Sequence, residues 1–225
     1  MADYIDIHSH KKINNTSSVF TIFNVLLPAN TTPINTFFST GCHPWDVKKT
    51  TPNLIEEQLN SFIKNEKLIA IGEIGLDRHI ETDIEIQKEA FEIQLNIAIK
   101  SNKPVMIHCV RAYSDLMNIV KNKRIEIPMI LHDYNGNRVQ TEKLLTFNCY
   151  FSFGKSLFQD RPKINEIFRG IPLDRLFLET DDSEVTIESV YSKAAEIHSI
   201  PLKQLITQEK QNFVEIFGAE ILNRR

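Results

Sequence analysis

The sequence lacks any hydrophobic run long enough to cross a membrane. Its longest apolar stretches, such as Val19–Pro28, fall well short of the ~20 residues that a spanning helix needs. The start of the chain lacks the basic and apolar segments of a signal peptide. With only three cysteines (Cys42, Cys109 and Cys149), at least one thiol is unpaired, which favours a reduced compartment. These absences predict a soluble, cytoplasmic protein with no membrane partner.

An excess of basic charge is also absent. The chain has 26 Lys and Arg against 29 Asp and Glu, a net charge of −3, which excludes a generally basic nucleic-acid coat but not a local basic patch. Low-complexity segments, internal repeats and linker-like Gly/Ser/Pro runs are missing too. The apolar share of 42% and the charged share of 24% are close to globular averages. We therefore expect residues 1–225 to form a single domain with a sizeable core.

From about residue 51 onward, segments with helical periodicity alternate with short apolar segments. The apolar segments are Leu68–Ile71, Pro104–Ile107, Pro128–Leu131, Cys149–Phe153 and Arg175–Glu179. Short apolar strands between helices indicate a parallel sheet covered by helices. Three further candidates, Tyr4–His8, Val19–Leu27 and Asn35–Gly41, bring the number of strands to eight, which a TIM-type (β/α)8 barrel requires.

The first third of the chain departs from this pattern. Only eight residues separate His10 from Val19, and the connection after Leu27 consists mostly of turn formers, whereas a helical crossover needs a dozen or more residues. The first two helices are therefore expected to be shortened or missing. Val19–Leu27 is either a barrel strand with bare loops or a return leg outside the barrel. The uncovered side predicts a mobile Lys11–Ser18 segment or a self-association surface.

Potential metal ligands stand where the predicted strands end. Asp6, His8 and His10 alternate with Ile5 and Ile7, so both imidazoles project from one face. The later strands end in Glu73, His108, His132 and Asp181. In a parallel barrel all these ends open onto one face, where active sites are built. Four imidazoles and two carboxylates are too many donors for one tetrahedral ion, and they suit two ions that share a carboxylate and a bridging water or hydroxide.

Several motifs fall at these positions. They are Asp-x-His-x-His at residues 6–10, Gly-Cys-His-Pro at 41–44, Gly-Glu-Ile-Gly-Leu-Asp at 72–77, His-Cys-Val-Arg at 108–111 and Glu-Thr-Asp at 179–181. Together they resemble the TatD family of metal-dependent hydrolases, within the amidohydrolase-like barrels. The similarity extends from residue 4 to about residue 182. The segment at 72–77 followed by the one at 108–111 is its most specific part.

The resemblance implies a two-metal hydrolase of the kind often described as a deoxyribonuclease. It implies six metal ligands, in chain order His8, His10, Glu73, His108, His132 and Asp181. The first two histidines would hold one ion and the last two the other. Glu73 would bridge the ions, and Asp181 would contact the first ion and act as the base, so these two carboxylates are the predicted catalytic residues. The expected cofactor is two divalent ions of zinc, manganese or magnesium.

Basic residues follow many of the predicted strand ends. They are Lys11, Lys12, Lys48, Lys49, Arg78, Arg111, Arg138 and Lys155. Either these are ordinary solvated loop residues, or they draw phosphates into an otherwise acidic protein. We predict Arg111, His43 and Arg78 as substrate-binding residues and DNA or a short nucleic acid as the substrate. Trp45 and Tyr134 are either stacking surfaces for a base or sugar or packing residues.

Two segments depart from the family. Residues 133–135 are Asp-Tyr-Asn in place of Cys-Phe-Ser, and residues 182–184 are Asp-Ser-Glu in place of a small residue, proline and an aromatic. Asp182 and Glu184 are expected to point outward, because an unpaired carboxylate beside a ligand carboxylate is costly. The acidic stretch favours an alternative function, hydrolysis of a small ester, lactone or amide. A third possibility is an inactive metal-binding barrel that serves as a binding module.

Overall fold

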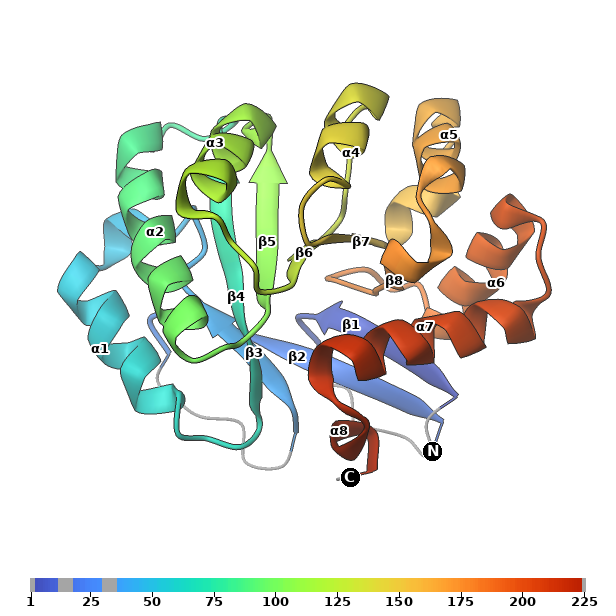
Figure 1. Ribbon diagram of the computed structural model, residues 1–225, viewed down its shortest axis with the longest axis horizontal. Helices are drawn as coiled ribbons and strands as arrows, with labels where there is room; N and C mark the ends of the chain where they lie inside the picture. Colours follow the sequence, from blue (N-terminus) through green and yellow to red (C-terminus); the bar gives the residue numbers. More distant parts are fainter. Residues whose placement is uncertain (1–2, 12–17, 30–35, 224–225) are drawn as a thin grey trace.

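The computed structural model describes residues 3–11, 18–29 and 36–223. All eight of its strands belong to one parallel sheet, in the order in which they occur along the chain (Figure 1). They are β1 (Tyr4–Ser9), β2 (Val19–Leu26), β3 (Phe38–Gly41), β4 (Leu68–Asp77), β5 (Val105–Val110), β6 (Met129–Leu131), β7 (Cys149–Phe153) and β8 (Leu176–Leu178). The predicted eight-stranded barrel is confirmed.

The barrel closes just beyond the ends of β1 and β8. The backbone N–H of Asp181 donates to the carbonyl of His8, and that of His10 donates to the carbonyl of Asp181, both over 3.0 Å. These two bonds form a single parallel bridge between Ser9 and Asp181. The closure therefore lies among the residues from which a metal site was predicted.

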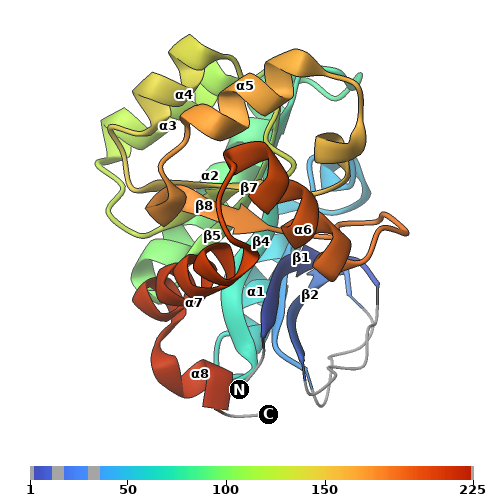
Figure 2. The same ribbon diagram turned by 90° about the vertical axis from the view of Figure 1, so that its right-hand side faces the viewer.

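Helices cover the outside of the barrel from β3 onward (Figures 1 and 2). They are α1 (Pro52–Phe62), α2 (Ile84–Lys100), α3 (Tyr113–Lys123), α4 (Arg138–Leu144), α5 (Pro162–Gly170), α6 (Ile187–His198), α7 (Leu202–Phe217) and α8 (Ala219–Asn223). Local signals explain several starts: the Thr51 hydroxyl caps α1, and Asn137 forms a capping box with Gln140 at α4. Gly218, with φ +89°, ends α7 and separates it from α8.

The first third of the chain contains no helix between β1 and β3 among its described residues, as predicted. β2 pairs in parallel with both β1 and β3, so Val19–Leu27 supplies a barrel strand and not an outer return leg. The outward-facing Phe23 and Val25 of β2 are half-buried. Residues 12–17, most of the predicted mobile Lys11–Ser18 segment, lie outside the described residues. Self-association through this side stays a prediction.

The core has two layers that follow the alternation of the strands. In β5 to β8, one residue of each strand (Met106, Ile130, Tyr150 and Phe177) joins an inner cluster, while the residues on either side of it pack outward against the helices. The inner cluster includes Phe20, Ile22, Ile69, Met106, Ile130, Tyr150 and Phe177. Phe213 of α7 and Ile221 and Leu222 of α8 join the same cluster and close one end of the barrel. Among the described helices, none combines the length and apolarity needed to span a bilayer.

Glu209 of α7 is a fully buried acid that predicts a pH-dependent stability. Both of its carboxylate oxygens lack a hydrogen-bond partner among the described residues, and burial raises its pKa well above the usual value near 4.5. The folded protein then binds more protons than the unfolded chain above pH ~4.5, so Glu209 lowers stability as the pH rises. We expect Glu209→Gln to raise the unfolding free energy at pH 7 by on the order of 1–3 kcal/mol, and by less near pH 4. Thermal melts of the wild type and the variant at the two pH values test this. A variant that is less stable than the wild type at pH 7, or whose stabilisation is as large near pH 4 as at pH 7, contradicts it.

Candidate metal centre

Strand β4 places a carboxylate in the middle of the open end of the barrel. The strand is longer than the sequence indicated, since it continues from Leu68 past Glu73 to Asp77. Close approach of β4 to β5 requires glycine here: a Cβ on Gly75 would lie 1.9 Å from the carbonyl oxygen of His108, and one on Gly72 would lie 2.5 Å from Met106 Cβ. This close packing brings Glu73 alongside the histidine of β5.

Glu73 lies between two pairs of histidines. Its Oε2 is 3.4 Å from His8 Nε2 and 3.2 Å from His10 Nε2, whereas its Oε1 is 3.0 Å from His108 Nδ1 and 2.7 Å from His132 Nε2. Burial would raise the pKa of Glu73, but the charge of His132 and hydrogen bonds from the histidines outweigh it and hold the pKa well below its usual value. The carboxylate is thus ionised, with one oxygen for each histidine pair.

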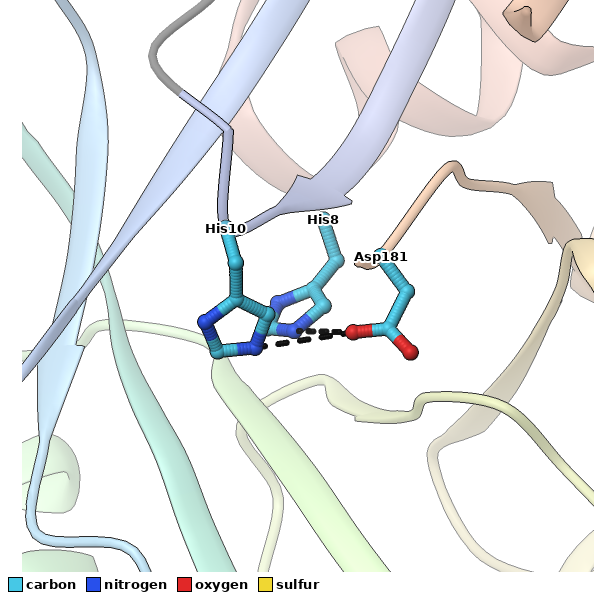
Figure 3. Close-up of side chains that lie close together, drawn as sticks. All are labelled: His8, His10 and Asp181. Carbon is cyan, nitrogen blue, oxygen red and sulfur yellow. Dashed lines mark ion pairs between the residues drawn. The ribbon is translucent and has the colours of Figure 1, made fainter. Parts of the chain in front are cut away.

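A second carboxylate faces the pair on β1. Figure 3 shows His8 and His10, from the end of β1, directed toward Asp181. Asp181 Oδ1 is 3.8 Å from His8 Nε2 and 3.5 Å from His10 Nε2. The buried Asp6 carboxylate fixes the preceding residue, because it accepts hydrogen bonds from the Thr180 backbone N–H (2.9 Å) and hydroxyl (2.7 Å). The Asp6 side chain therefore positions Asp181 across the closure of the barrel.

The donor set fits divalent cations. Both ring nitrogens of the fully buried His8 lack a hydrogen-bond partner among the described residues, which is costly unless a cation is bound. His108 Nδ1 and His132 Nε2 lie 3.3 Å apart and converge on the same carboxylate oxygen. Burial would lower the pKa of His132, yet the charges of Glu73 and Glu179 and a hydrogen bond with Glu73 raise it well above its usual value. The electrostatics of this cluster of histidines and carboxylates therefore favour the binding of a cation.

Three groups of donor atoms lie close enough to hold an ion. They are His8, His10 and Asp181; His8, Glu73 and His132; and His43, Glu73 and His108. Imidazole and carboxylate donors in this proportion suit zinc or manganese and accept magnesium. The six predicted ligands are all brought together, and the prediction that Glu73 lies close to both His108 and His132 agrees with the geometry.

His43 has a defined tautomer. Its Nδ1 accepts the backbone N–H of Trp45 at 3.2 Å, so in the neutral ring Nε2 carries the proton and donates it to Glu73 Oε1 at 3.0 Å. Burial lowers the pKa of His43, which keeps the ring neutral. The sequence predicted His43 as a substrate contact. It lines the site cavity, and its nearest partner is the central carboxylate.

Asp77 orients the histidine of β5. Its Oδ2 is 3.2 Å from His108 Nε2 and accepts the indole N–H of Trp45 at 2.8 Å. The bond to Nε2 leaves Nδ1 of His108 facing Glu73, as a metal ligand requires. Burial would raise the pKa of Asp77, but the bonds from His108 and Trp45 lower it to about 2. Glu179 is an ionic neighbour of His132 and not a hydrogen-bond partner, with Oε1 3.6 Å from Nδ1.

Asp77→Asn tests this orienting role. The substitution keeps the shape but removes the charge that fixes His108, so we expect affinity for the more weakly bound ion to fall by roughly 10–100-fold. Competition with a chelating dye measures it. Asp160→Asn, at an exposed position outside the cluster, is the matched control and should bind metal normally. Equal affinity in both variants would contradict the role of Asp77.

A cavity of about 460 Å³ opens over the cluster. Its lining includes His10, His43, Trp45, Lys49, Glu73, His108, His132, Asp133, Asn135, Lys155, Asp181 and Asp182. Of the predicted substrate contacts, Arg78 and Arg111 are exposed and are not among the described residues that line it. Arg78 instead binds Asp115 through two hydrogen bonds of 2.7 and 3.0 Å. In these positions, neither arginine side chain contacts a substrate inside this cavity.

The side chains of the two segments that depart from the family differ in where they lie relative to the cavity. Asp182 lies at the cavity rim, where Lys155 Nζ contacts its Oδ1 at 2.6 Å, and Glu184 is exposed and pairs with Lys11. The expectation that both point outward therefore holds for Glu184 and only in part for Asp182. Tyr134 is buried and packs against Phe151 at 4.6 Å, so it is a packing residue.

Lys155, predicted only as one of the basic residues that follow strand ends, lies with Nζ 3.4 Å from Asp181 Oδ2. Sequence reasoning missed two other side chains that contact the cluster. Asn24 donates to Glu73 Oε2 at 3.3 Å, and its position as a polar residue next to Phe23 and Val25 was a usable signal. Asp77 was quoted within a motif but assigned no role, because β4 was expected to end earlier.

The fold and the cluster define a parallel barrel with a candidate metal centre at the carboxyl ends of its strands. The model of TatD-related DNases matches residues 8–218, and the chain belongs to this family. The predicted family is thus confirmed. The chain is 37% identical over 148 residues to the uncharacterised metal-dependent hydrolase YabD of Bacillus subtilis, covering 63% of this chain and 56% of YabD.

Two further comparisons agree. The chain is 31% identical over 146 residues to the 3'-5' ssDNA/RNA exonuclease TatD of Klebsiella pneumoniae, covering 63% of this chain and 55% of that protein. The match thus spans little more than half the length of this relative and of YabD. The crystal structure of YjjV, a TatD homologue of Escherichia coli K12, superposes with a TM-score of 0.83 at 21% identity over 97% of this chain and 99% of that one. This superposition supports the barrel fold.

Proposed function

We propose that this chain is a metal-dependent hydrolase that cleaves phosphodiester bonds of DNA or short nucleic acids. The observation that carries the proposal is Glu73, whose two carboxylate oxygens face two separate histidine pairs. His8, His10 and Asp181 would hold one ion, His108 and His132 the other, and Glu73 both. Ions of zinc, manganese or magnesium bound there would lower the pKa of water and polarise the phosphate.

The side chains around the cluster have distinct tasks in this proposal. Asp181 acts as the base that accepts a proton from the attacking water, and Asp6 holds it in place through Thr180. Lys155 places an ammonium 3.4 Å from Asp181 Oδ2, where it neutralises acidic charge at the cavity rim and can pair with a phosphate oxygen. His43 donates its Nε2 proton to Glu73 and stabilises the ionised carboxylate.

The family and one relative's name support a nucleic-acid substrate. The specific observation in favour of the second candidate, a small ester, lactone or amide, is that Asp133 and Asp182 line the cavity and repel a polyanion. Lys155 offsets Asp182. This ion pair favours the phosphodiester.

A substrate panel tests the proposal. Protein stripped of metal and reloaded with zinc, manganese or magnesium is offered short single-stranded DNA and RNA, duplex DNA, a 4-nitrophenyl ester, a lactone and an anilide. We expect hydrolysis of the nucleic acid, abolished by a chelator and restored by metal. Faster turnover of a neutral ester, lactone or amide would favour the second candidate. Tight metal binding without any turnover would favour a binding module.

We also propose that residues 1–225 act as one domain, because all eight strands share one sheet. A cytoplasmic location is proposed on the three buried free thiols, which suit a reducing compartment.

A further inference from the structure

Trp45 is an exposed aromatic side chain at the mouth of the metal cavity. It is the only tryptophan in the sequence, and 60% of its surface is open to solvent. It lines the same cavity as Glu73, His108 and Asp181. Most other aromatic side chains in the described part of the chain are buried in the core. An indole left open beside a polar reaction site presents a large apolar surface to whatever enters.

The indole is held in a fixed orientation. Its Nε1–H donates to Asp77 Oδ2 at 2.8 Å, and Asp77 in turn contacts His108. The ring also packs at a steep angle against two imidazoles, with centroid distances of 5.0 Å to His43 and 6.1 Å to His108. The N–H edge is therefore tied to the metal centre, while much of the ring surface stays free. A rigid aromatic loses little entropy when a planar group stacks on it.

We infer that Trp45 is a stacking platform for an unpaired nucleobase next to the phosphate held over the Glu73 cluster. The inference rests on the proposed function and narrows its substrate class. Every base offers a π-face, so such stacking tolerates any sequence. In a duplex, however, the neighbouring bases cover this face, so only an unpaired base can stack on the indole. Trp45 thus selects single-stranded nucleic acid or an unpaired strand end over duplex DNA and over small esters without a planar group.

The cavity is compatible with this ligand. Its volume of about 460 Å³ lies within the range of small-molecule sites, and it is large enough for one nucleotide. Lys155, on the lining beside Asp181, supplies a cation for the phosphate. The lining also includes two apolar residues, Leu26 and Val110. The lining therefore offers both a stacking surface and a site for the phosphate.

Tryptophan fluorescence gives a direct test, because Trp45 is the only fluorophore of its kind. The wild-type protein, purified without chelators, is titrated with dAMP and separately with 2-deoxyribose 5-phosphate, which carries the same phosphate without a base. We expect dAMP to quench the emission with saturation and the base-free sugar phosphate to leave it unchanged. Equal effects of the two ligands would overturn the inference.

Substitutions of Trp45 separate the contribution of base stacking to affinity from that of the rest of the site. Calorimetry with dAMP should show roughly ten- to hundredfold weaker binding for Trp45→Ala, whereas Trp45→Phe keeps most of the affinity. Trp45→Ala and Trp45→Phe both lose the N–H that bonds Asp77, so these two variants should bind 2-deoxyribose 5-phosphate equally. Phe158→Ala, which removes another exposed aromatic outside the cavity lining, is the matched control and should bind dAMP normally. Unchanged dAMP affinity in a folded Trp45→Ala would overturn the inference.

Cleavage assays distinguish this inference from the proposed function. Single-stranded DNA with and without an abasic 3' terminus is digested by the wild type and by Trp45→Ala. We expect the variant to lose its preference for the intact strand. If no strand is cut while dAMP still quenches selectively, the phosphodiesterase proposal fails and the stacking site stands. If both strands are cut equally by both proteins, the stacking site fails and the phosphodiesterase stands.

Discussion

Replacing Glu73 by glutamine is expected to lower hydrolysis by at least about a thousandfold, or roughly 4 kcal/mol of barrier. The reason is geometric as well as electrostatic. Each carboxylate oxygen faces a different histidine pair, so one substitution removes a ligand from both positions and also removes the charge between them. The neutral amide cannot replace that charge. Steady-state rates on a short single-stranded DNA measure the effect.

The matched control for this change is Glu142→Gln on α4, where the carboxylate is exposed and pairs only with Arg138 among the described residues. It should retain wild-type activity and metal content. Circular dichroism and thermal melting show whether Glu73→Gln is folded. A folded Glu73→Gln protein that keeps more than a tenth of the wild-type rate would contradict the central position of this carboxylate.

Asp181→Asn is expected to reduce turnover by about a thousandfold while the protein still binds metal. General-base catalysis supplies about this much rate, and an amide oxygen cannot accept the proton. The other ligands, Glu73, His108 and His132, remain in place, so at least one ion should still bind. The two variants therefore differ in metal content even where both lose activity.

Glu184→Gln is the control for Asp181→Asn, since Glu184 is a nearby carboxylate that points to solvent and pairs with Lys11. It should change the rate on DNA by less than about tenfold, or under ~1.4 kcal/mol. Metal content by elemental analysis accompanies the kinetics. Near-wild-type turnover by Asp181→Asn would remove this residue from the role of base.

Most of the barrel could be predicted from the sequence, because parallel strands covered by helices give short apolar segments that alternate with amphipathic helical segments. The strand β7 has the bounds that the pattern predicted. β4 was predicted too short because Gly72 looks like the end of a strand, whereas in the structure glycine allows β4 to pack closely on β5. The role of Val19–Leu27 as a barrel strand could be assigned only from its strand pairing in the structure, because this pairing depends on contacts distant in sequence.

The positions of the candidate metal ligands were predictable for a similar reason. They lie within or just after the carboxyl-terminal halves of their strands, and a parallel barrel brings these ends together. The partners that orient them were not, because Asp77, Asn24 and Lys155 act through side-chain directions that spacing alone does not give. The predicted contacts Arg78 and Arg111 illustrate the same limit: each follows a motif in sequence, but its side chain lies outside the cavity lining among the described residues.

The central claim is that Glu73 bridges two ions, and anomalous diffraction tests it most directly. Crystals of the wild-type protein grown with manganese should show two anomalous peaks, roughly 3.5–4 Å apart, on either side of the Glu73 carboxylate. One peak should lie beside His8, His10 and Asp181 and the other beside His108 and His132. A single peak, or two peaks of which neither lies within bonding distance of Glu73, would contradict the account.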